Sequence, residues 1–115
     1  MAQAKRRTRA ATPESIVLKA VLQFVSYHPR VAWAERMNTG AMSFDQRFVR
    51  FGFVGCPDIL GQMMDGRVLA IECKAPKGDL TMPQATFLAR VERHGGISGV
   101  ARSIDDAKRI IEGVA

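Results

Sequence analysis

Two apolar segments joined by Asp65-Gly66 constrain the fold of this chain more than any other feature. Residues 57–63 and 67–75 are rich in apolar side chains. An Asp-Gly pair between two such segments is typical of a two-residue β-hairpin turn, in which both turn residues need a positive φ. The sequence therefore predicts two antiparallel strands at the centre of the fold.

The second of these strands carries two charged side chains among apolar neighbours. Side chains alternate between the two faces of a strand, so Glu72 and Lys74 should share one face and lie about 7 Å apart. Leu69, Ile71 and Cys73 should point to the other face. The hairpin partner can bring Asp58 beside Glu72 and Lys74. Two carboxylates and one ammonium are then expected on one patch of a largely apolar sheet.

This patch has the chemistry of a metal site that acts on a phosphodiester. Hard cations such as Mg²⁺ bind carboxylate oxygens and keep several waters. A bound metal lowers the pKa of a water and neutralises charge on a phosphoryl oxygen. A lysine beside it can stabilise charge or orient the attacking water. The alternative interpretation is a structural Glu–Lys pair on an edge strand.

A helix is predicted over residues 12–27, with Thr12 as N-cap and Pro13 at its first position. Glu14 falls on the apolar face of this helix, which should pack on the sheet. A carboxylate there needs a partner, because burying a charge is unfavourable. A metal can supply one, and the alternative is an acid favoured by the helix dipole.

The second half of the chain predicts two more helices around a short strand. Thr81 should cap a helix that ends near His94, and Ser103 should cap the last helix. The strand between them covers residues 97–101. Gln84 either bonds back to Thr81 in a capping box or points toward the sheet beside the site, since it shares a helix face with Leu88.

Together with strands predicted at residues 31–37 and 44–53, separated by a polar loop at 38–43, this pattern indicates one α/β domain. We expect a single mixed central β-sheet flanked by helices. The domain should span residues 12–115. Residues 1–11 carry four Lys and Arg residues and no core-forming segment, so they predict a disordered basic arm that either contacts phosphates or is a solvated tail.

The balance of charge favours a polyanionic partner. The chain has 17 Lys and Arg residues against 11 Asp and Glu residues, a formal net charge of +6, which fits a nucleic-acid-binding protein. The candidate DNA contacts are Arg36, Arg47, Arg50 and Lys77. Cys56 and Cys73 have no zinc-binding spacing and are expected to be reduced thiols of a cytoplasmic protein. No apolar run reaches about 18 residues, so no membrane span is expected.

Pro57-Asp58, a turn and Glu72-Cys73-Lys74 resemble the signature of PD-(D/E)XK nucleases. A wider pattern is similar to the VRR-NUC branch of that superfamily: Glu14, Asn38-Thr39-Gly40, Arg50-Phe51-Gly52, Gly55-Cys56-Pro57-Asp58-Ile59, Ile71-Glu72-Cys73-Lys74-Ala75-Pro76, Gln84 and Gly95-Gly96. The resemblance runs from about Thr12 to the C-terminus. It implies a restriction-endonuclease-like core.

The resemblance also implies roles for individual residues. Asp58 and Glu72 would hold Mg²⁺ or Mn²⁺, with the backbone carbonyl of Cys73 as a further ligand. Glu14 would bind the metal directly or through water. Lys74 would position the hydrolytic water and stabilise charge, and Gln84 would help to orient the water or Lys74.

The expected function is that of a metal-dependent DNA endonuclease. Standalone relatives resemble compact homodimers that act on branched DNA, so we expect a structure-selective homodimer that cuts Holliday junctions or similar DNA. A small domain offers little surface for sequence readout, which favours the same interpretation. The main alternative is a catalytically inactive DNA-binding module on the same fold. A different metal-dependent hydrolase, or a structural subunit, is a third.

Overall fold

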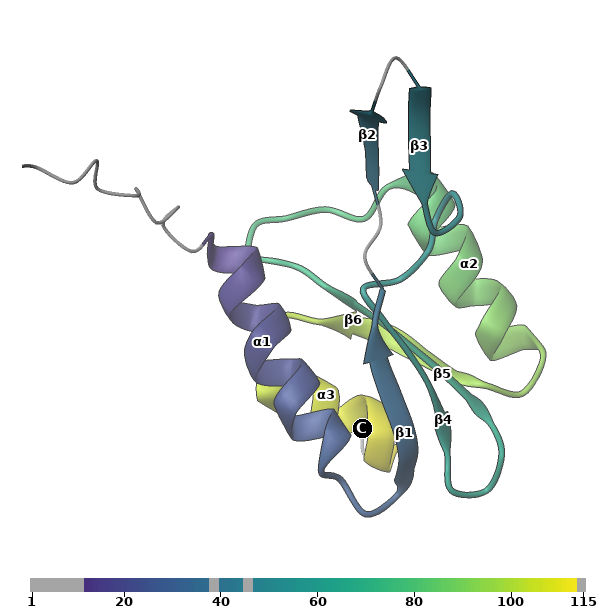
Figure 1. The fold of residues 1–115 in the computed structure, drawn as a ribbon. Helices are drawn as coiled ribbons and strands as arrows, with labels where there is room; N and C mark the ends of the chain where they lie inside the picture. Colours follow the sequence, from purple (N-terminus) through teal and green to yellow (C-terminus); the bar gives the residue numbers. More distant parts are fainter. Residues whose placement is uncertain (1–11, 38–39, 45–46, 114–115) are drawn as a thin grey trace, which may run out of the picture.

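The computed structural model describes residues 12–37, 40–44 and 47–113, with only the backbone path for 40–44 and 47–51. Within these residues, three helices and six strands follow one another (Figure 1). They are α1 (Pro13–Ser26), β1 (Val31–Arg36), β2 (Gly40–Phe44), β3 (Arg47–Phe51), β4 (Ile59–Met63), β5 (Val68–Cys73), α2 (Met82–Arg93), β6 (Ile97–Ala101) and α3 (Ile104–Glu112).

The four strands of the main sheet lie in the order β1-β4-β5-β6. β4 pairs antiparallel with both β1 and β5, whereas β5 and β6 are parallel. Parallel neighbours need a crossover connection, and α2 provides it. The predicted α/β domain with a mixed sheet is thus confirmed.

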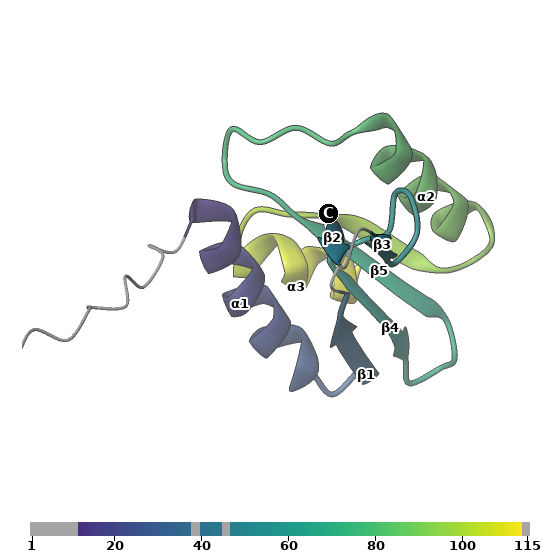
Figure 2. The same cartoon turned by 45° about the horizontal axis from the view of Figure 1, so that its top comes forward.

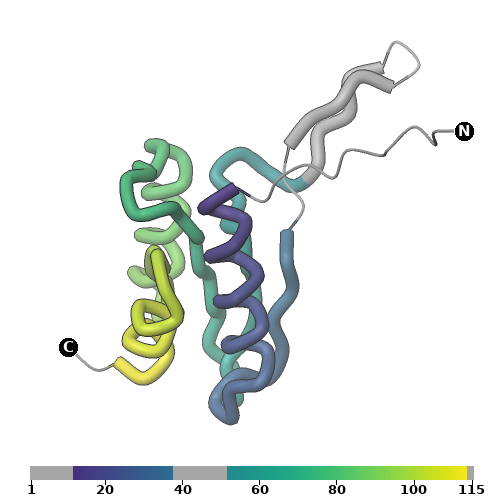
Figure 3. The backbone as a smooth tube through the Cα atoms, turned by 90° about the vertical axis from the view of Figure 1, so that its left-hand side faces the viewer, coloured from purple at the N-terminus to yellow at the C-terminus, as the bar shows by residue number. Residues whose placement is uncertain are grey.

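Helices cover both faces of this sheet. α1 and α3 lie on one side of the strands and α2 on the other (Figure 2). Seen from the α1 side, α1 and α3 run side by side (Figure 3). The larger core cluster joins these two helices to β4 and β5, through residues that include Leu18, Ile59, Leu69, Ile71 and Ile111.

The alternation predicted for β5 holds in the packing. Leu69, Ile71 and Cys73 belong to the core cluster under α1 and α3, whereas Ala70 packs with Leu88 and Val91 of α2. A strand with helices on both faces has no solvated side. Glu72, which follows Ala70 on its face by the same alternation, therefore lies in the interior.

The predicted helix caps are also present. The Thr12 hydroxyl accepts the Ser15 N–H at 3.1 Å, and Ser103 and Thr81 cap α3 and α2 in the same manner. His94 ends α2 and Gly113 ends α3. Each of the three N-caps satisfies an N–H group that the first turn of a helix leaves without a partner.

The prediction for residues 38–53 is wrong in part. A loop at 38–43 and one strand at 44–53 were expected, but β2 and β3 form an antiparallel hairpin of their own, separate from the main sheet. Phe44 pairs with Arg47 across its end. The backbone groups of a strand need hydrogen-bond partners, and β2 provides them for β3. The segment that forms β2 resembles a loop in sequence because it contains Gly40 and Ser43.

The turn between β4 and β5 also differs from the prediction. The Met63 N–H donates to the Arg67 carbonyl at 2.8 Å, so three residues rather than two form the connection. Gly66 has a φ of 96° and donates its N–H to the Met63 carbonyl. A turn followed by a glycine with positive φ is the usual three-residue hairpin loop. The hairpin itself, which positions the candidate site, is as predicted.

Candidate active site

Asp58 lies immediately before β4 and is fixed by backbone contacts to two other strands. Its carboxylate Oδ2 accepts the Cys73 N–H at 2.8 Å, at the end of β5. Its carbonyl accepts the Met37 N–H at 2.8 Å, just after β1. Asp58 therefore holds the start of β4 against the ends of β1 and β5, with its side chain next to Glu72.

Glu72 is a buried acid with an unsatisfied oxygen. The residue is only 2% exposed, and its Oε2 has no hydrogen-bond partner among the described residues. Burial, reinforced by a hydrogen bond to Asp58 and by the charge of that residue, raises the pKa of Glu72 to about 9. Lys74 opposes this shift, but less strongly. The site therefore stabilises either a proton or a cation at Glu72.

Lys74 follows β5 and is 9% exposed. Its N–H donates to the Ala101 carbonyl at 3.1 Å, which continues the β5–β6 pairing by one residue. Its Nζ lies 3.9 Å from Oε1 of Glu14, in the first turn of α1. The Glu14 side chain is half exposed, so this pair is weak by itself but brings α1 to the site.

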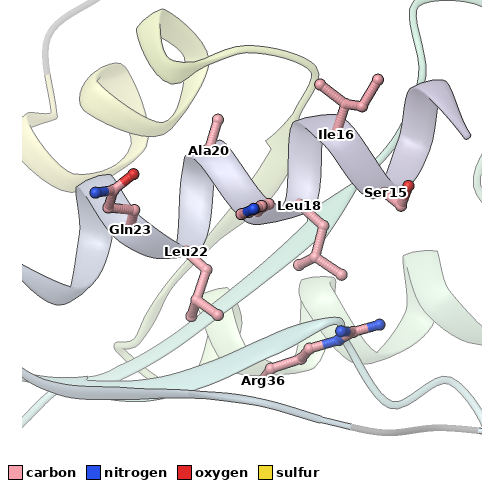
Figure 4. Close-up of a pocket in the computed structure, with 8 residues that line it drawn as sticks. Ser15, Ile16, Leu18, Ala20, Leu22, Gln23 and Arg36 are labelled. Carbon is pink, nitrogen blue, oxygen red and sulfur yellow. The ribbon is translucent and has the colours of Figure 1, made fainter. Parts of the chain in front are cut away.

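A cavity of about 250 Å³ opens at this point between α1, β1 and the start of β4. Glu14, Arg36 and Asp58 are among the residues that line it. It shares Ser15, Leu18 and Arg36 with a larger, mainly apolar cavity of about 740 Å³ along α1. In Figure 4, Leu18 points from α1 toward β1, where the Arg36 side chain extends. Arg36 thus lies at the entrance to the site.

The structure brings together Glu14, Asp58, Glu72 and Lys74, as the sequence predicted, with Arg36 beside them. Their exact roles stay predictions. Within residues 12–37, 40–44 and 47–113, no group of three His, Cys, Asp or Glu residues converges as a ready-made metal site. The donors that fit a hard cation are the two neighbouring carboxylates of Asp58 and Glu72, which leaves most of its coordination to water.

Gln84 occupies the capping-box position. Its Oε1 accepts the Thr81 N–H at 2.9 Å, and its own N–H donates to the Thr81 hydroxyl at 3.3 Å. The capping box is one of the two positions that the sequence allowed for Gln84. Its proposed role in orienting water or Lys74 stays a prediction, and so does the proposed role of the Cys73 carbonyl as a metal ligand.

The other predicted DNA contacts are only partly described. Lys77 is exposed in the loop after Lys74. The side chains of Arg47 and Arg50 lie outside the described part of the chain, as does the predicted basic arm at residues 1–11.

Both thiols are held in their neutral form by burial. Cys56 and Cys73 are free and buried. Burial raises the pKa of both thiols, that of Cys73 to about 12. They are neutral at physiological pH and thus neither nucleophiles nor thiolate ligands.

One residue at the site was missed by the sequence analysis. Arg102, between β6 and α3, donates hydrogen bonds to carbonyls of the loop after Lys74. A single basic residue between a strand and an N-cap serine is typical of a solvated charge. The signal that could have identified Arg102 is the parallel pairing of β5 with β6. This pairing places the two strand ends side by side, and therefore Arg102 beside the loop after Lys74.

Comparison with known proteins identifies a family for this chain. The model of the VRR-NUC domain matches residues 9–105. No curated protein matches the chain. In the part of the chain that the structure describes, no helix combines the length and apolar character needed to cross a bilayer.

The raised pKa of Glu72 predicts a pH-dependent stability. In metal-free folded protein the carboxyl stays protonated up to about pH 9, whereas in the unfolded chain it ionises near 4.5. The contribution of the neutral carboxyl is complete below pH 4.5 and is lost as the pH rises toward 9. Glu72→Gln stays neutral, so in EDTA it should flatten this pH dependence. The substitution should also raise Tm at pH 8, by about 4–8 °C for each kcal/mol that the free energy of unfolding gains.

Thermal unfolding in EDTA from pH 5 to pH 9 measures this effect. Glu92→Gln, at an exposed position of α2, is the matched control and should follow the parent profile. If the profiles of Glu72→Gln and the parent run parallel, Glu72 does not carry the raised pKa.

Proposed function

Because the chain belongs to the VRR-NUC domain family, which implies a nuclease-type function, we propose that it is a metal-dependent DNA endonuclease. The observation that carries this proposal is the buried Glu72 carboxylate, with one unsatisfied oxygen, beside Asp58. A buried acid without a partner is unfavourable for stability alone. The same acid is suited to binding a divalent cation, which would make the charged form the stable one.

In this proposal Asp58 and Glu72 hold Mg²⁺ or Mn²⁺, with the carbonyl of Cys73 as a further ligand. Glu14 is half exposed and tied to Lys74, which suits a contact through water rather than a direct one. When bound, the cation supplies an acidified water and neutralises charge on the phosphodiester. Hard carboxylate oxygens are the donors that such a cation prefers.

The cationic side chains have separate tasks. Lys74 is nearly buried, so its ammonium is suited to orienting the attacking water and stabilising charge on the phosphoryl oxygen. Arg36 lines the cavity that reaches Asp58 and is suited to binding a DNA phosphate. Lys77, Arg47 and Arg50 are proposed to extend this contact along the strand. Gln84 is proposed to support Lys74 or the water, in addition to its capping role.

A cleavage assay tests this function. We expect the parent protein to cut labelled duplex, flap or four-way-junction DNA with Mg²⁺ or Mn²⁺ and not with EDTA. Asp58→Asn keeps the size of the side chain but removes a ligand charge, and should lower the single-turnover rate by at least about 10²-fold. Its DNA binding, measured in Ca²⁺, should change little.

Two results would contradict the proposal. One is full cleavage by Asp58→Asn. The other is a parent protein that binds each of these DNAs but cuts none of them with either metal, since this describes an inactive DNA-binding module.

We further propose that the active unit is a homodimer that prefers branched DNA. One domain carries one candidate site, and a four-way junction offers two equivalent strands. Two-fold symmetry matches two sites to two scissile bonds. Light scattering should give twice the 12.6 kDa mass of the chain at micromolar concentration. A monomer at all concentrations, with and without junction DNA, would exclude this assembly.

A further inference from the structure

Arg102 makes an unusual set of contacts for a half-buried arginine. A single nitrogen of its guanidinium, Nη1, donates to the Ala75 carbonyl at 2.6 Å and to the Gly78 carbonyl at 2.7 Å. It also lies 3.4 Å from the Pro76 carbonyl. All three acceptors belong to the loop that begins directly after Lys74. Each is a backbone group, so the contacts fix the path of the loop rather than the identity of its side chains.

Arg102 is itself held in place from the other side. The backbone N–H of Arg102 donates to the carboxylate of Asp106, in the first turn of α3, at 2.8 Å. The preceding residue, Ala101, accepts the Lys74 N–H. The backbone of Lys74 is therefore hydrogen-bonded to Ala101, the last residue of β6. The loop after Lys74 is hydrogen-bonded to Arg102, the residue that follows Ala101. Arg102 extends the β5–β6 pairing beyond the point where the strands end.

The loop also turns back toward Lys74. The Gly78 N–H donates to the Ala75 carbonyl at 2.9 Å, which turns the chain back on itself. A Cβ added at Gly78 would lie 3.6 Å from the Cβ of Lys74, so Gly78 lies close to the base of the lysine side chain. A shift of Gly78, to which Arg102 is bound, would therefore change the space available to Lys74.

From these contacts we propose that Arg102 is a positioning residue, which holds the loop after Lys74 and through it the Lys74 ammonium in the geometry that cleavage requires. The proposal rests on the nuclease function proposed above. Arg102 touches no reacting group in this account and acts only through Lys74. A misplacement of about 1 Å in a catalytic group can lower a rate by about 10²-fold, so loosening the loop should affect turnover more than binding.

A double-mutant cycle with Lys74 tests this role. Arg102→Met keeps much of the apolar stem but removes the donors, and should lower the single-turnover cleavage rate by at least about 10-fold while DNA affinity in Ca²⁺ changes by less than about twofold. In the Lys74→Met background the same substitution should lower the rate by less than about twofold, because the group it positions is absent. Arg102→Lys should recover most of the rate, since one ammonium can donate to all three carbonyls.

Hydrogen exchange gives a readout that does not depend on activity. Exchange in a peptide covering residues 75–79 should be faster in Arg102→Met than in the parent and near parental in Arg102→Lys. Lys108→Met removes the same charge from an exposed position of α3 and should change neither exchange nor rate. If Arg102→Met does not fold, Arg102→Gln takes its place in both measurements.

The outcomes separate this inference from the function on which it rests. A parent protein that cuts no DNA overturns the proposed function, and the positioning role with it. An active parent with equal rate losses in both backgrounds shows that Arg102 does not act through Lys74. Unchanged loop exchange, or a parental rate in Arg102→Met, overturns the positioning role alone.

Discussion

The hydrogen bond from the Cys73 N–H to the Asp58 carboxylate connects the start of β4 to the end of β5, and the site depends on this connection. It fixes Asp58 in a position where its charge acts directly on Glu72, which is 2% exposed. Two acids so close cannot both be charged in a buried site unless something compensates them, because desolvation and like-charge repulsion both oppose ionisation. A proton or a cation must compensate this charge.

This constraint explains the layout around the pair. Helices on both faces of the sheet exclude water from Glu72, and α1 brings Glu14 to within reach of Lys74. Asp58, together with Arg36, lines a cavity between α1, β1 and the start of β4. An arrangement built for stability alone would replace a buried, unsatisfied carboxylate by an apolar side chain, which is often more stable. The fold therefore retains an unfavourable buried group beside Asp58, which lines the cavity, and groups of this kind are common in active sites.

Much of this could be predicted from local signals. The alternation along β5 identified the faces of Leu69 and Glu72, because strand geometry repeats every two residues, and cap residues such as Thr12 marked the helix starts because their chemistry is local. The β2–β3 hairpin was missed because its strands pair with each other, which depends on a partner rather than on propensity. Gln84 could not be assigned because one position satisfies both a capping box and a site-facing orientation. Arg102 was missed because its contacts join segments more than twenty residues apart.

The central claim, that the Asp58–Glu72 pair exchanges a proton for a cation, is tested most directly by calorimetric titration of the protein with Mn²⁺ at pH 7. Repeating the titration in buffers of different ionisation enthalpy gives the number of protons released on binding. We predict the release of about one proton per bound cation in the parent, because burial beside Asp58 keeps Glu72 protonated until the metal binds, and none in Glu72→Gln. Binding by the parent without proton release, or equal binding by Glu72→Gln, would contradict the account.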